Sequence, residues 1–456
     1  MKERSLPERV RDRVDEVAEK SPARLAISVF VAIIVLFTAL LQLPIATTST
    51  NRAPFTDALF TATSAVCVTG LTTVDTATYW SPFGQAIIAL GIMIGGMGVM
   101  TLASILAFAV SRHIGLTQRM LTASETKTQR LGEVGALVRA VIVTSLIVEA
   151  ALALVFFPRF VTLGDEALPA LWHAIFMSIS VFNNAGFVVL PHGLEPHVAD
   201  WWFNLPIILG TVLGAIGFPV LLNVARRWRT PRKWTLHTKL TLTTYGLLSL
   251  LAFVAIPVLE WNNPATFGAL DGSGKAVAAL LFSVNSRTLG LATIDVADFN
   301  SSTWFLQDAL MFIGGGTAST AGGIKVTTFA VLLLAIVAEA RGDRDIEVFS
   351  RRIPNDTVRL SVAVAFIGAT LVGIAALLLI LITGESLDVV LFETISAFAT
   401  VGLSTGLTPT LPEHGKLVLI ALMFAGRLGT MTVAAALALR SNLRVVRMPE
   451  ERPSIG

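Results

Sequence analysis

The stretch Ser396-Ala-Phe-Ala-Thr-Val-Gly402-Leu403 occurs in four related versions along the 456-residue chain. The other three versions are Ser64-Ala-Val-Cys-Val-Thr-Gly70-Leu71, Ser180-Val-Phe-Asn-Asn-Ala-Gly186-Phe187 and Val284-Asn-Ser-Arg-Thr-Leu-Gly290-Leu291. Successive glycines are separated by 116, 104 and 112 residues. This period is far longer than the roughly 20–50 residues of a solenoid repeat, so the sequence predicts four similar structural units in one chain.

The composition is that of a membrane protein. Hydrophobic residues make up 54% of the chain and charged residues only 14%, against about 25% charged residues in soluble proteins. The clearest apolar runs, several of them close to the length that spans a hydrocarbon core, are 26–45, 87–110, 140–157, 241–258, 326–338, 360–383 and 417–439. We therefore predict a multi-pass protein in a lipid bilayer, and its single cysteine, Cys67, excludes an intramolecular disulfide.

The basic residues predict the topology. Of the 34 lysines and arginines, 27 fall in five segments, namely 1–24, 112–139, 226–239, 341–359 and 440–452. Cytoplasmic loops carry such an excess, so these segments and the N-terminus are predicted to be cytoplasmic. Acidic residues dominate the intervening outward stretches; they either concentrate cations or are simply tolerated there, because the topology rule counts Lys and Arg.

Each unit is predicted to contain a long helix, a short helix, a glycine loop and a second long helix. The predicted domains are a cytoplasmic N-terminal segment (1–22), units 23–130, 131–230, 231–345 and 346–445, and a cytoplasmic tail (446–456). The second long helices are expected at 82–111, 201–227, 303–341 and 414–440. The short helices, at 167–181 for example, are too short to cross the bilayer and end at the loops, so their negative dipole ends would face a cation.

The glycine loops are the candidate binding site. Non-helical backbone at membrane depth is tolerated only where protein or water surrounds it, so we expect the four loops to converge on one axis. Glycine there permits a positive φ that turns carbonyls toward the axis. The predicted filter residues are Val68, Thr69, Gly70, Asn184, Ala185, Gly186, Thr288, Leu289, Gly290, Thr400, Val401 and Gly402. The alternative, that each glycine merely ends a helix, explains one loop more easily than four in register.

Thr400-Val401-Gly402 matches the opening of the K⁺-channel filter TVGYG. With its three companions, the chain resembles the Trk/Ktr/HKT superfamily of K⁺ transporters over residues 23–440. The lack of an extra N-terminal helix pair makes it look like the Ktr-type membrane subunit rather than the longer Trk type. The resemblance implies an all-α integral membrane fold with four pseudo-repeated units around a central pore, and K⁺ at the filter carbonyls. It also implies a bacterial inner-membrane uptake system, a homodimer, a cytosolic nucleotide-binding regulatory ring and no cofactor in this chain. Val68-Thr69, Asn184-Ala185 and Thr288-Leu289 depart from Thr-Val, which leaves the preference for K⁺ over Na⁺ open.

Residues 314–323 predict a broken helix in the third unit. Five of these ten residues are glycine, each costing about 1 kcal/mol relative to alanine in a helix. The segment resembles the intramembrane gating loop of the same superfamily. The predicted gate residues are Gly314, Gly315, Gly316, Thr317, Ala318, Ser319, Thr320, Ala321, Gly322, Gly323, Lys325 and Arg427. Close helix packing is the alternative for the glycines, and a nucleotide-binding loop is excluded because GxxxxGK[ST] is absent.

Four charged residues lie in apolar context. Arg427 would retard ions, or pair with Glu or with backbone carbonyls around the broken loop, or fasten the fourth unit through an ion pair. Lys325 either joins the gate or snorkels to the inner interface. Glu149 and Glu393 are candidate partners for these bases, or hydrogen-bonded structural acids.

Two other transport functions are alternatives to a channel-like K⁺ pathway. One is a Na⁺- or H⁺-coupled carrier of an organic solute, which usually has inverted repeats. Another is the K⁺-binding subunit of an ATP-driven pump, which would need a partner because this chain has no ATPase motif. No catalytic constellation or nucleic-acid motif is present in the sequence, so an enzyme is the least favoured class.

Overall fold

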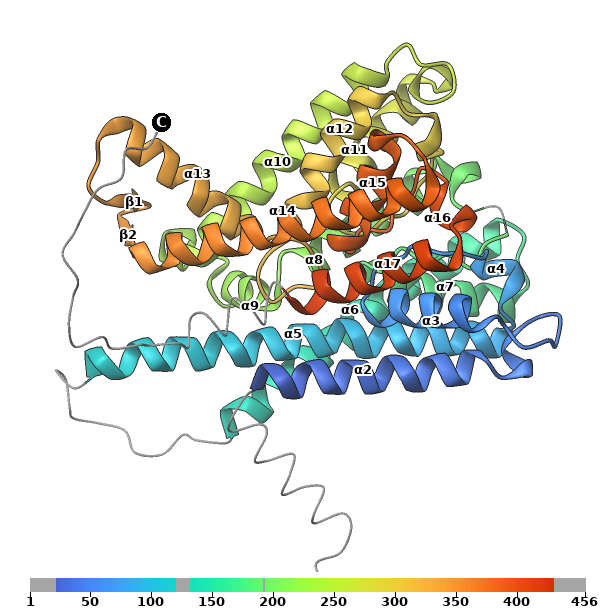
Figure 1. Cartoon of the computed structure of the whole chain (residues 1–456), viewed down its shortest axis with the longest axis horizontal. Helices are drawn as coiled ribbons and strands as arrows, with labels where there is room; N and C mark the ends of the chain where they lie inside the picture. The colour runs from blue at the N-terminus through green and yellow to red at the C-terminus, as the bar shows by residue number, and fades with distance from the viewer. Residues whose placement is uncertain (1–21, 120–131, 192, 430–456) are drawn as a thin grey trace, which may run out of the picture.

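The structure, a computed structural model, describes residues 22–119, 132–191 and 193–429. The predicted N-terminal segment 1–22 (except Pro22) and the tail 446–456 lie outside these residues. Within them the chain is mostly helical, and the helices run along the long axis of the molecule (Figure 1).

The elements follow the predicted order in each unit. The opening long helices are α2 (Pro22–Leu41), α6 (Gly132–Thr162), α10 (Leu236–Glu260) and α14 (Asn355–Thr383). The short helices before the glycine loops are α3 (Phe55–Val66), α7 (Ala167–Asn183), α11 (Gly272–Asn285) and α15 (Leu387–Phe398). The closing helices are α5 (Pro82–Arg119), α8 (Trp201–Ala215) with α9 (Phe218–Arg227), α12 (Ser301–Phe312) with α13 (Val326–Arg341), and α17 (Glu413–Phe424).

Minor elements connect these helices. They are α4 (Thr76–Tyr79), α16 (Leu407–Thr410), the short 3₁₀ turns η1 (Pro44–Ala46), η2 (Glu195–His197), η3 (Pro231–Lys233), η4 (Phe267–Ala269) and η5 (Val296–Asp298), and the π-helical turn η6 (Ala425–Gly429). Strands β1 (Ile346–Val348) and β2 (Arg351–Ile353) form an antiparallel hairpin beyond α13. The all-α prediction omitted this hairpin, which lies at the end of the molecule opposite α4 and α16 (Figure 1).

Side-chain chemistry explains where several helices begin. Asp271 accepts a hydrogen bond from the backbone N–H of Gly274 at 2.6 Å and caps α11, while Asp200 caps α8 and Thr235 caps α10 in the same way. Such oxygens satisfy N–H groups that have no partner inside the helix. The caps therefore fix the first turns of helices that lead toward the glycine loops or away from them.

Four described helices are long and apolar enough to cross a bilayer: α5 (its part Pro82–Leu102), α6, α10 and α14. Large apolar side chains on three of them are exposed, as at Leu154 (75%), Leu247 (62%) and Phe366 (72%). An apolar surface this extensive needs lipid or protein to cover it. The chain is therefore a multi-pass membrane protein whose outer helices present apolar faces to their surroundings.

Two closing helices differ from the continuous helices that the sequence predicted. In the second unit the predicted helix 201–227 is broken between α8 and α9, which meet at a bend of 100°. Gly217 has a φ of 92° there, at which an L residue is strained, and Pro219 lies in the first turn of α9. In the fourth unit the α-helix ends at Phe424 and a π-helical turn follows, while residues 430–440 of the prediction lie outside the described residues.

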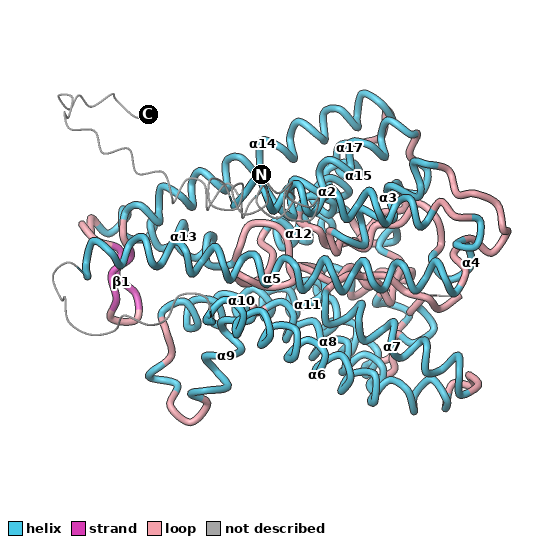
Figure 2. Tube along the Cα trace, turned by 90° about the horizontal axis from the view of Figure 1, so that it is seen from below, coloured by secondary structure: helices cyan, strands magenta, loops and turns pink. Residues whose placement is uncertain are grey.

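The units pack in a closed order. Helix α5 of the first unit contacts α7 of the second, α8 contacts α11 of the third, α12 contacts α15 of the fourth, and α17 contacts α3 of the first. Loop backbone runs through the middle of the molecule with helices on both sides (Figure 2). Each closing helix therefore supports the short helix of the next unit, which places the four glycine loops around a common centre.

Candidate functional site

The four glycine loops meet in one ring. A Cβ on Gly70 would strike the carbonyl oxygen of Ala185, and one on Gly186 would strike that of Leu289. In the same way Gly290 faces the carbonyl of Val401, and Gly402 faces that of Thr69, which closes the circle. Glycines and carbonyl oxygens thus alternate around a centre formed by segments up to about 330 residues apart in the sequence.

The backbone at the ring has an uncommon conformation. The glycines have φ values of 91°, 72°, 70° and 98° in chain order. Two residues before the glycine, Val68, Asn184 and Thr400 also have positive φ, between 48° and 58°, whereas Thr288 does not. Non-glycine residues in this region are uncommon and are held there by their surroundings. Three of the loops therefore share one turn, and the third departs from it.

Side chains that the sequence analysis did not assign hold these turns. Ser64 Oγ accepts a hydrogen bond from the N–H of Gly70, and Ser396 Oγ accepts one from the N–H of Gly402, both at 3.1 Å. In the third unit Asn285 replaces this arrangement: its side chain accepts from the N–H of Leu291 at 3.1 Å and donates to the carbonyl of the same residue. The recurrence of serine six residues before three of the glycines was the only signal in the sequence.

A second unassigned residue, Arg287, lies inside the third loop. It is fully buried, and its guanidinium lies over the ring of Tyr245, 3.6 Å from the centroid. It also donates to the carbonyl of Tyr245 at 3.1 Å and to the hydroxyl of Ser249. Cation–π attraction strengthens when the pair is desolvated. Arg287 thereby fastens the third loop to α10, although it lies outside the five basic segments that set the predicted topology.

The segment between α12 and α13 is the predicted broken helix, and it is not helical at residues 313–325. Backbone bonds tie it to the broken α8–α9 corner: the N–H of Gly316 donates to Ala215 at 2.8 Å, and the N–H of Phe218 donates to Ala318 at 3.0 Å. Ser319 Oγ donates to the carbonyl of Gly316 at 2.6 Å. The interrupted segment and the α8–α9 corner thus provide hydrogen-bond partners for each other's backbone N–H and C=O groups, which lipid could not do.

The glycines of segment 314–323 are needed for close approach. A Cβ on Gly322 would meet the carbonyl of Ala399 and the hydroxyl of Thr400, and one on Gly316 would meet the carbonyl of Ile216. Thr317 shares a hydrogen bond with Thr327 at 3.1 Å. The segment consequently lies directly against the fourth glycine loop on one side and the α8–α9 corner on the other.

Both bases predicted for the gate, the partly buried Lys325 and the buried Arg427, bond to this segment. Lys325 Nζ donates to the carbonyl of Ala321 at 2.6 Å and to that of Gly322 at 3.3 Å. Arg427 Nη1 donates to the carbonyl of Thr320, while its Nε and Nη2 have no hydrogen-bond partner in the described part of the chain. Of the interpretations left open by the sequence, this geometry matches a backbone contact at the broken loop for both residues.

The two buried acids bond to polar groups close to the ring. Glu149 accepts from Asn183 Nδ2 at 2.8 Å. Glu393 accepts from Ser404, Thr405 and Thr408, at 2.5–3.1 Å, in the segment that follows the fourth glycine. Neither acid forms an ion pair with Lys325 or Arg427 in the described residues. They are therefore hydrogen-bonded acids, one of the two alternatives that the sequence left.

Inner-helix glycines pack against the short helices. Gly95, Gly214 and Gly426 would each place a Cβ against the carbonyl of the residue four before the ring glycine. Spacing along the sequence favours Gly210 in the second unit, because it follows its ring glycine by 24 residues as Gly426 does, but a Cβ on Gly210 would face Val181 and Leu152 side chains. Close packing thus explains these glycines, and Gly214 is the second unit's equivalent.

Polar bonds link neighbouring units outside the ring, again in closed order. They are Trp172 Nε1 to Gln85 Oε1 (2.9 Å), Trp201 Nε1 to Ser273 Oγ (2.8 Å), Ser301 Oγ to Asp388 Oδ2 (3.5 Å) and Lys416 Nζ to Asp57 Oδ1 (2.7 Å). The last is an ion pair between the fourth and first units, with side chains 14% and 13% exposed. It links the fourth unit to the first and completes the series of polar contacts between neighbouring units.

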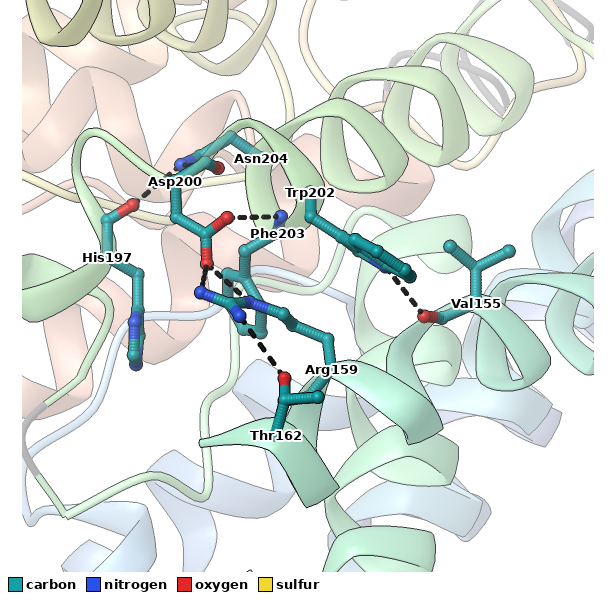
Figure 3. A network of polar contacts seen from close by, with 8 residues as sticks. All are labelled: Val155, Arg159, Thr162, His197, Asp200, Trp202, Phe203 and Asn204. Atoms are coloured by element: carbon teal, nitrogen blue, oxygen red, sulfur yellow. Dashed lines mark hydrogen bonds and ion pairs between the residues drawn. The ribbon is translucent and has the colours of Figure 1, made fainter. Parts of the chain in front are cut away.

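A further network holds the start of α8 (Figure 3). Arg159 of α6 bonds to Asp200 through Nε at 2.7 Å and Nη2 at 2.6 Å. Asp200 also accepts from the N–H of Phe203 at 3.3 Å, and Asn204 donates to the carbonyl of His197 at 2.7 Å. These contacts tie the loop after the second glycine to both long helices of its unit.

Long apolar helices around a buried ring of backbone oxygens define an integral membrane protein of the type that handles cations. The chain belongs to the TrkH family, described as "Cation transport protein", whose family model matches residues 15–443. It is 39% identical to Ktr system potassium uptake protein B of Bacillus subtilis (strain 168), over 93% of this chain and 94% of that protein. It is 35% identical to Ktr system potassium uptake protein B of Vibrio alginolyticus, over 99% and 98% of the two chains.

The fold is similar to a solved structure. The potassium transporter TrkH from Vibrio parahaemolyticus superposes with a TM-score of 0.68 at 20% sequence identity, covering 91% of this chain and 85% of that one. At this identity the likeness establishes the fold. Membership of the family rests on the family match and on the two more similar relatives.

Proposed function

We propose that this chain is the ion-translocating membrane subunit of a K⁺ uptake system in the bacterial plasma membrane. The observation that carries the proposal is the closed ring in which the carbonyls of Thr69, Ala185, Leu289 and Val401 each lie against the glycine of a neighbouring unit. Its relatives from Bacillus subtilis and Vibrio alginolyticus are named as potassium uptake proteins. The four units would form a K⁺-channel-like pore, with K⁺ as the transported ion and the N-terminus in the cytoplasm.

The chemistry proposed for the ring is replacement of an ion's hydration shell. Backbone carbonyls present fixed dipoles to a cation that has lost its water. The positive φ of the ring glycines and of Val68, Asn184 and Thr400 supports turns that direct successive carbonyls to one side. The four short helices end at these turns, so the negative ends of their dipoles add to the attraction. A channel-like pathway is thereby favoured over an alternating-access carrier, for which the ring has no evident use.

Residues 314–323, with Lys325 and Arg427, form the proposed gate. Gly322 lies against Ala399 and Thr400 at the foot of the fourth loop, so the segment would obstruct an ion leaving the ring. Lys325 and Arg427 bond to three carbonyls of the segment, which holds it in the obstructing position. Movement of the segment would require these bonds to exchange for water or other partners.

The proposed partners are a second copy of the chain and a cytosolic nucleotide-binding ring. The word "system" in the names of the Ktr relatives supports an assembly of several components. The basic segments, among them 226–239 and 341–359, lie at helix ends where a cytosolic partner would dock. Na⁺ dependence of transport is part of the same proposal and is tested by the Na⁺ requirement of uptake.

Uptake of radiolabelled Rb⁺ by a K⁺-auxotrophic bacterium expressing the chain tests the proposal. We expect the chain to restore growth at low K⁺, and Gly290→Ser and Gly402→Ser to admit Na⁺. Deletion of residues 317–320 should raise flux. Failure to restore uptake would contradict the proposal, and so would an unchanged K⁺ preference in both glycine variants of the purified protein.

A further inference from the structure

The second glycine loop differs chemically from the others at one ring position. Two residues before the ring glycine the four units carry Val68, Asn184, Thr288 and Thr400. A carboxamide has two N–H donors and a separate acceptor oxygen, so it can bridge two hydroxyl groups at once. Asn184 is fully buried, and buried polar atoms generally find partners. We therefore expect its side chain to bond to neighbouring loops.

Asn184 joins two other segments of the site. Its Nδ2 donates to Thr320 Oγ1 at 2.6 Å, and its Oδ1 accepts from Thr288 Oγ1 at 2.7 Å. Thr320 lies in the segment between α12 and α13, while Thr288 belongs to the third glycine loop. Contacts from Nδ2 to the carbonyls of Phe182 and Thr211 are 3.4 Å long, near the limit for a hydrogen bond. The bond to Thr320 is thus the principal one made by this donor group.

Thr320 is held from both sides. Its N–H donates to the carbonyl of Gly214 at 3.2 Å, and its carbonyl accepts from Arg427. A Cβ on Gly214 would meet Asn184 Nδ2 and Thr320 Oγ1, so the inner helix, the second loop and the gate segment touch here without spare room. A chain of bonds therefore runs from Arg427 through Thr320 and Asn184 to Thr288.

We propose that Asn184 is a positioning residue that couples the glycine ring to segment 314–323, an inference that rests on the proposed function. With the segment in place, both ends of the carboxamide are paired and the second and third loops are held together. Displacement of Thr320 leaves a buried donor unpaired, which is unfavourable, so the turn at Asn184 must rearrange. By linkage, K⁺ in the ring then stabilises the seated segment to the same extent that the segment strengthens K⁺ binding.

The test compares Thr320→Val, Thr320→Ser, Asn184→Ala and the double variant Asn184→Ala/Thr320→Val in liposomes. Valine has the shape of threonine without the hydroxyl, whereas serine keeps the hydroxyl. Thr38→Val is the matched control, because Thr38 is also buried and its hydroxyl, among the described residues, donates to the carbonyl of Ile34 in the same helix at 2.8 Å. The first readout is the K⁺ concentration that half-saturates transport, measured with radiolabelled Rb⁺ as a tracer. The others are the K⁺/Na⁺ permeation ratio and K⁺-dependent thermal stability in detergent.

We expect Thr320→Val to raise the half-saturating K⁺ concentration by about fivefold or more, at the lower end of measured couplings between sites. Thr38→Val should retain wild-type values, and Thr320→Ser should be affected much less than Thr320→Val because it keeps the hydroxyl. The double variant should be no more affected than the stronger single variant. If Asn184→Ala does not fold, the serine and valine variants of Thr320 decide the matter alone.

Two results would overturn the coupling and are distinct from failure of the proposed function. One is a Thr320→Val variant that changes maximal flux while half-saturation and the ion ratio stay at wild-type values. The other is a double variant whose effects multiply as those of independent sites do. Either result with a K⁺-selective wild type rejects the coupling only, whereas a wild type without K⁺ flux rejects the proposed function and the coupling with it.

Discussion

Replacing Gly402 by alanine should reduce ion selectivity while the helices remain in place. At φ 98° an L residue is strained by about 1–2 kcal/mol. The new Cβ would also strike the carbonyl oxygen of Thr69, closer than real Cβ atoms approach any neighbour. One of the four oxygens of the ring must then move. A contact between a charged group and a polar partner contributes about 1.5–3 kcal/mol, which corresponds to roughly tenfold to a hundredfold in ion affinity.

Gly406 provides the matched control for this change. Its φ is 92°, so alanine is strained there to a similar degree, yet a Cβ would meet no atom within 4 Å. Both variants should be purified, reconstituted in liposomes and compared by radiolabelled Rb⁺ flux in competition with K⁺ and Na⁺. We expect the K⁺/Na⁺ ratio to fall at least about tenfold in Gly402→Ala and to keep its wild-type value in Gly406→Ala.

The outcome separates ring geometry from backbone strain. A Gly402→Ala protein that keeps the wild-type ion ratio would refute the assignment of the Thr69 carbonyl to the ion pathway. An equal loss of selectivity in Gly406→Ala would show that strain anywhere in the fourth loop is sufficient, and the argument from the carbonyl contact would fail.

Three further predictions follow from named contacts. Ser396→Ala removes the hydroxyl that accepts from Gly402 and leaves a partly buried N–H unpaired, at a cost of at most about 1–3 kcal/mol. Na⁺ flux should therefore rise, whereas Ser180→Ala, whose Oγ has no partner among the described residues, should have little effect. Asp57→Asn should lower the free energy of unfolding because Lys416 loses its partner. The loss should lie between about 1 kcal/mol, as for exposed ion pairs, and about 3 kcal/mol, as for buried ones. A double variant with Lys416→Met should recover part of the loss, and a fully additive loss would contradict the pairing. Burial lowers the pKa of His197 below its ordinary value of 6.5, so protonation of this side chain disfavours the folded state. The contribution of neutral His197 to folding stability is complete above pH 6.5 and declines as the pH falls below it. His197→Gln should flatten the dependence of the melting temperature on pH below 6.5, and an unaltered profile would contradict this role of His197.

The sequence predicted the elements of the fold because their signals are local. Apolar length, basic segments and the repeated glycines marked the long helices, the short helices and the loops, and five glycines within 314–323 marked the interruption after α12. The hairpin β1–β2 was missed because three-residue strands leave no periodic pattern. The break at Gly217 was missed because one glycine and one proline in an apolar run are also compatible with a kinked helix.

Partners across the site depended on tertiary structure. Nothing local indicated that Arg427 bonds to Thr320 or that Asn184 bridges Thr320 and Thr288. These pairs are separated in the sequence by up to 136 residues, and their meeting depends on how the helices pack.

The sequence by itself predicted four similar units in a multi-pass membrane protein, each containing a turn that requires glycine. It could do so because hydropathy, charge and backbone conformation are properties of neighbouring residues. Only the tertiary structure decided that each glycine faces the carbonyl of another unit and that the broken helix lies against the ring. The physical reason is that these contacts exist only when closing helices of one unit support the short helix of the next, a condition that involves the whole chain.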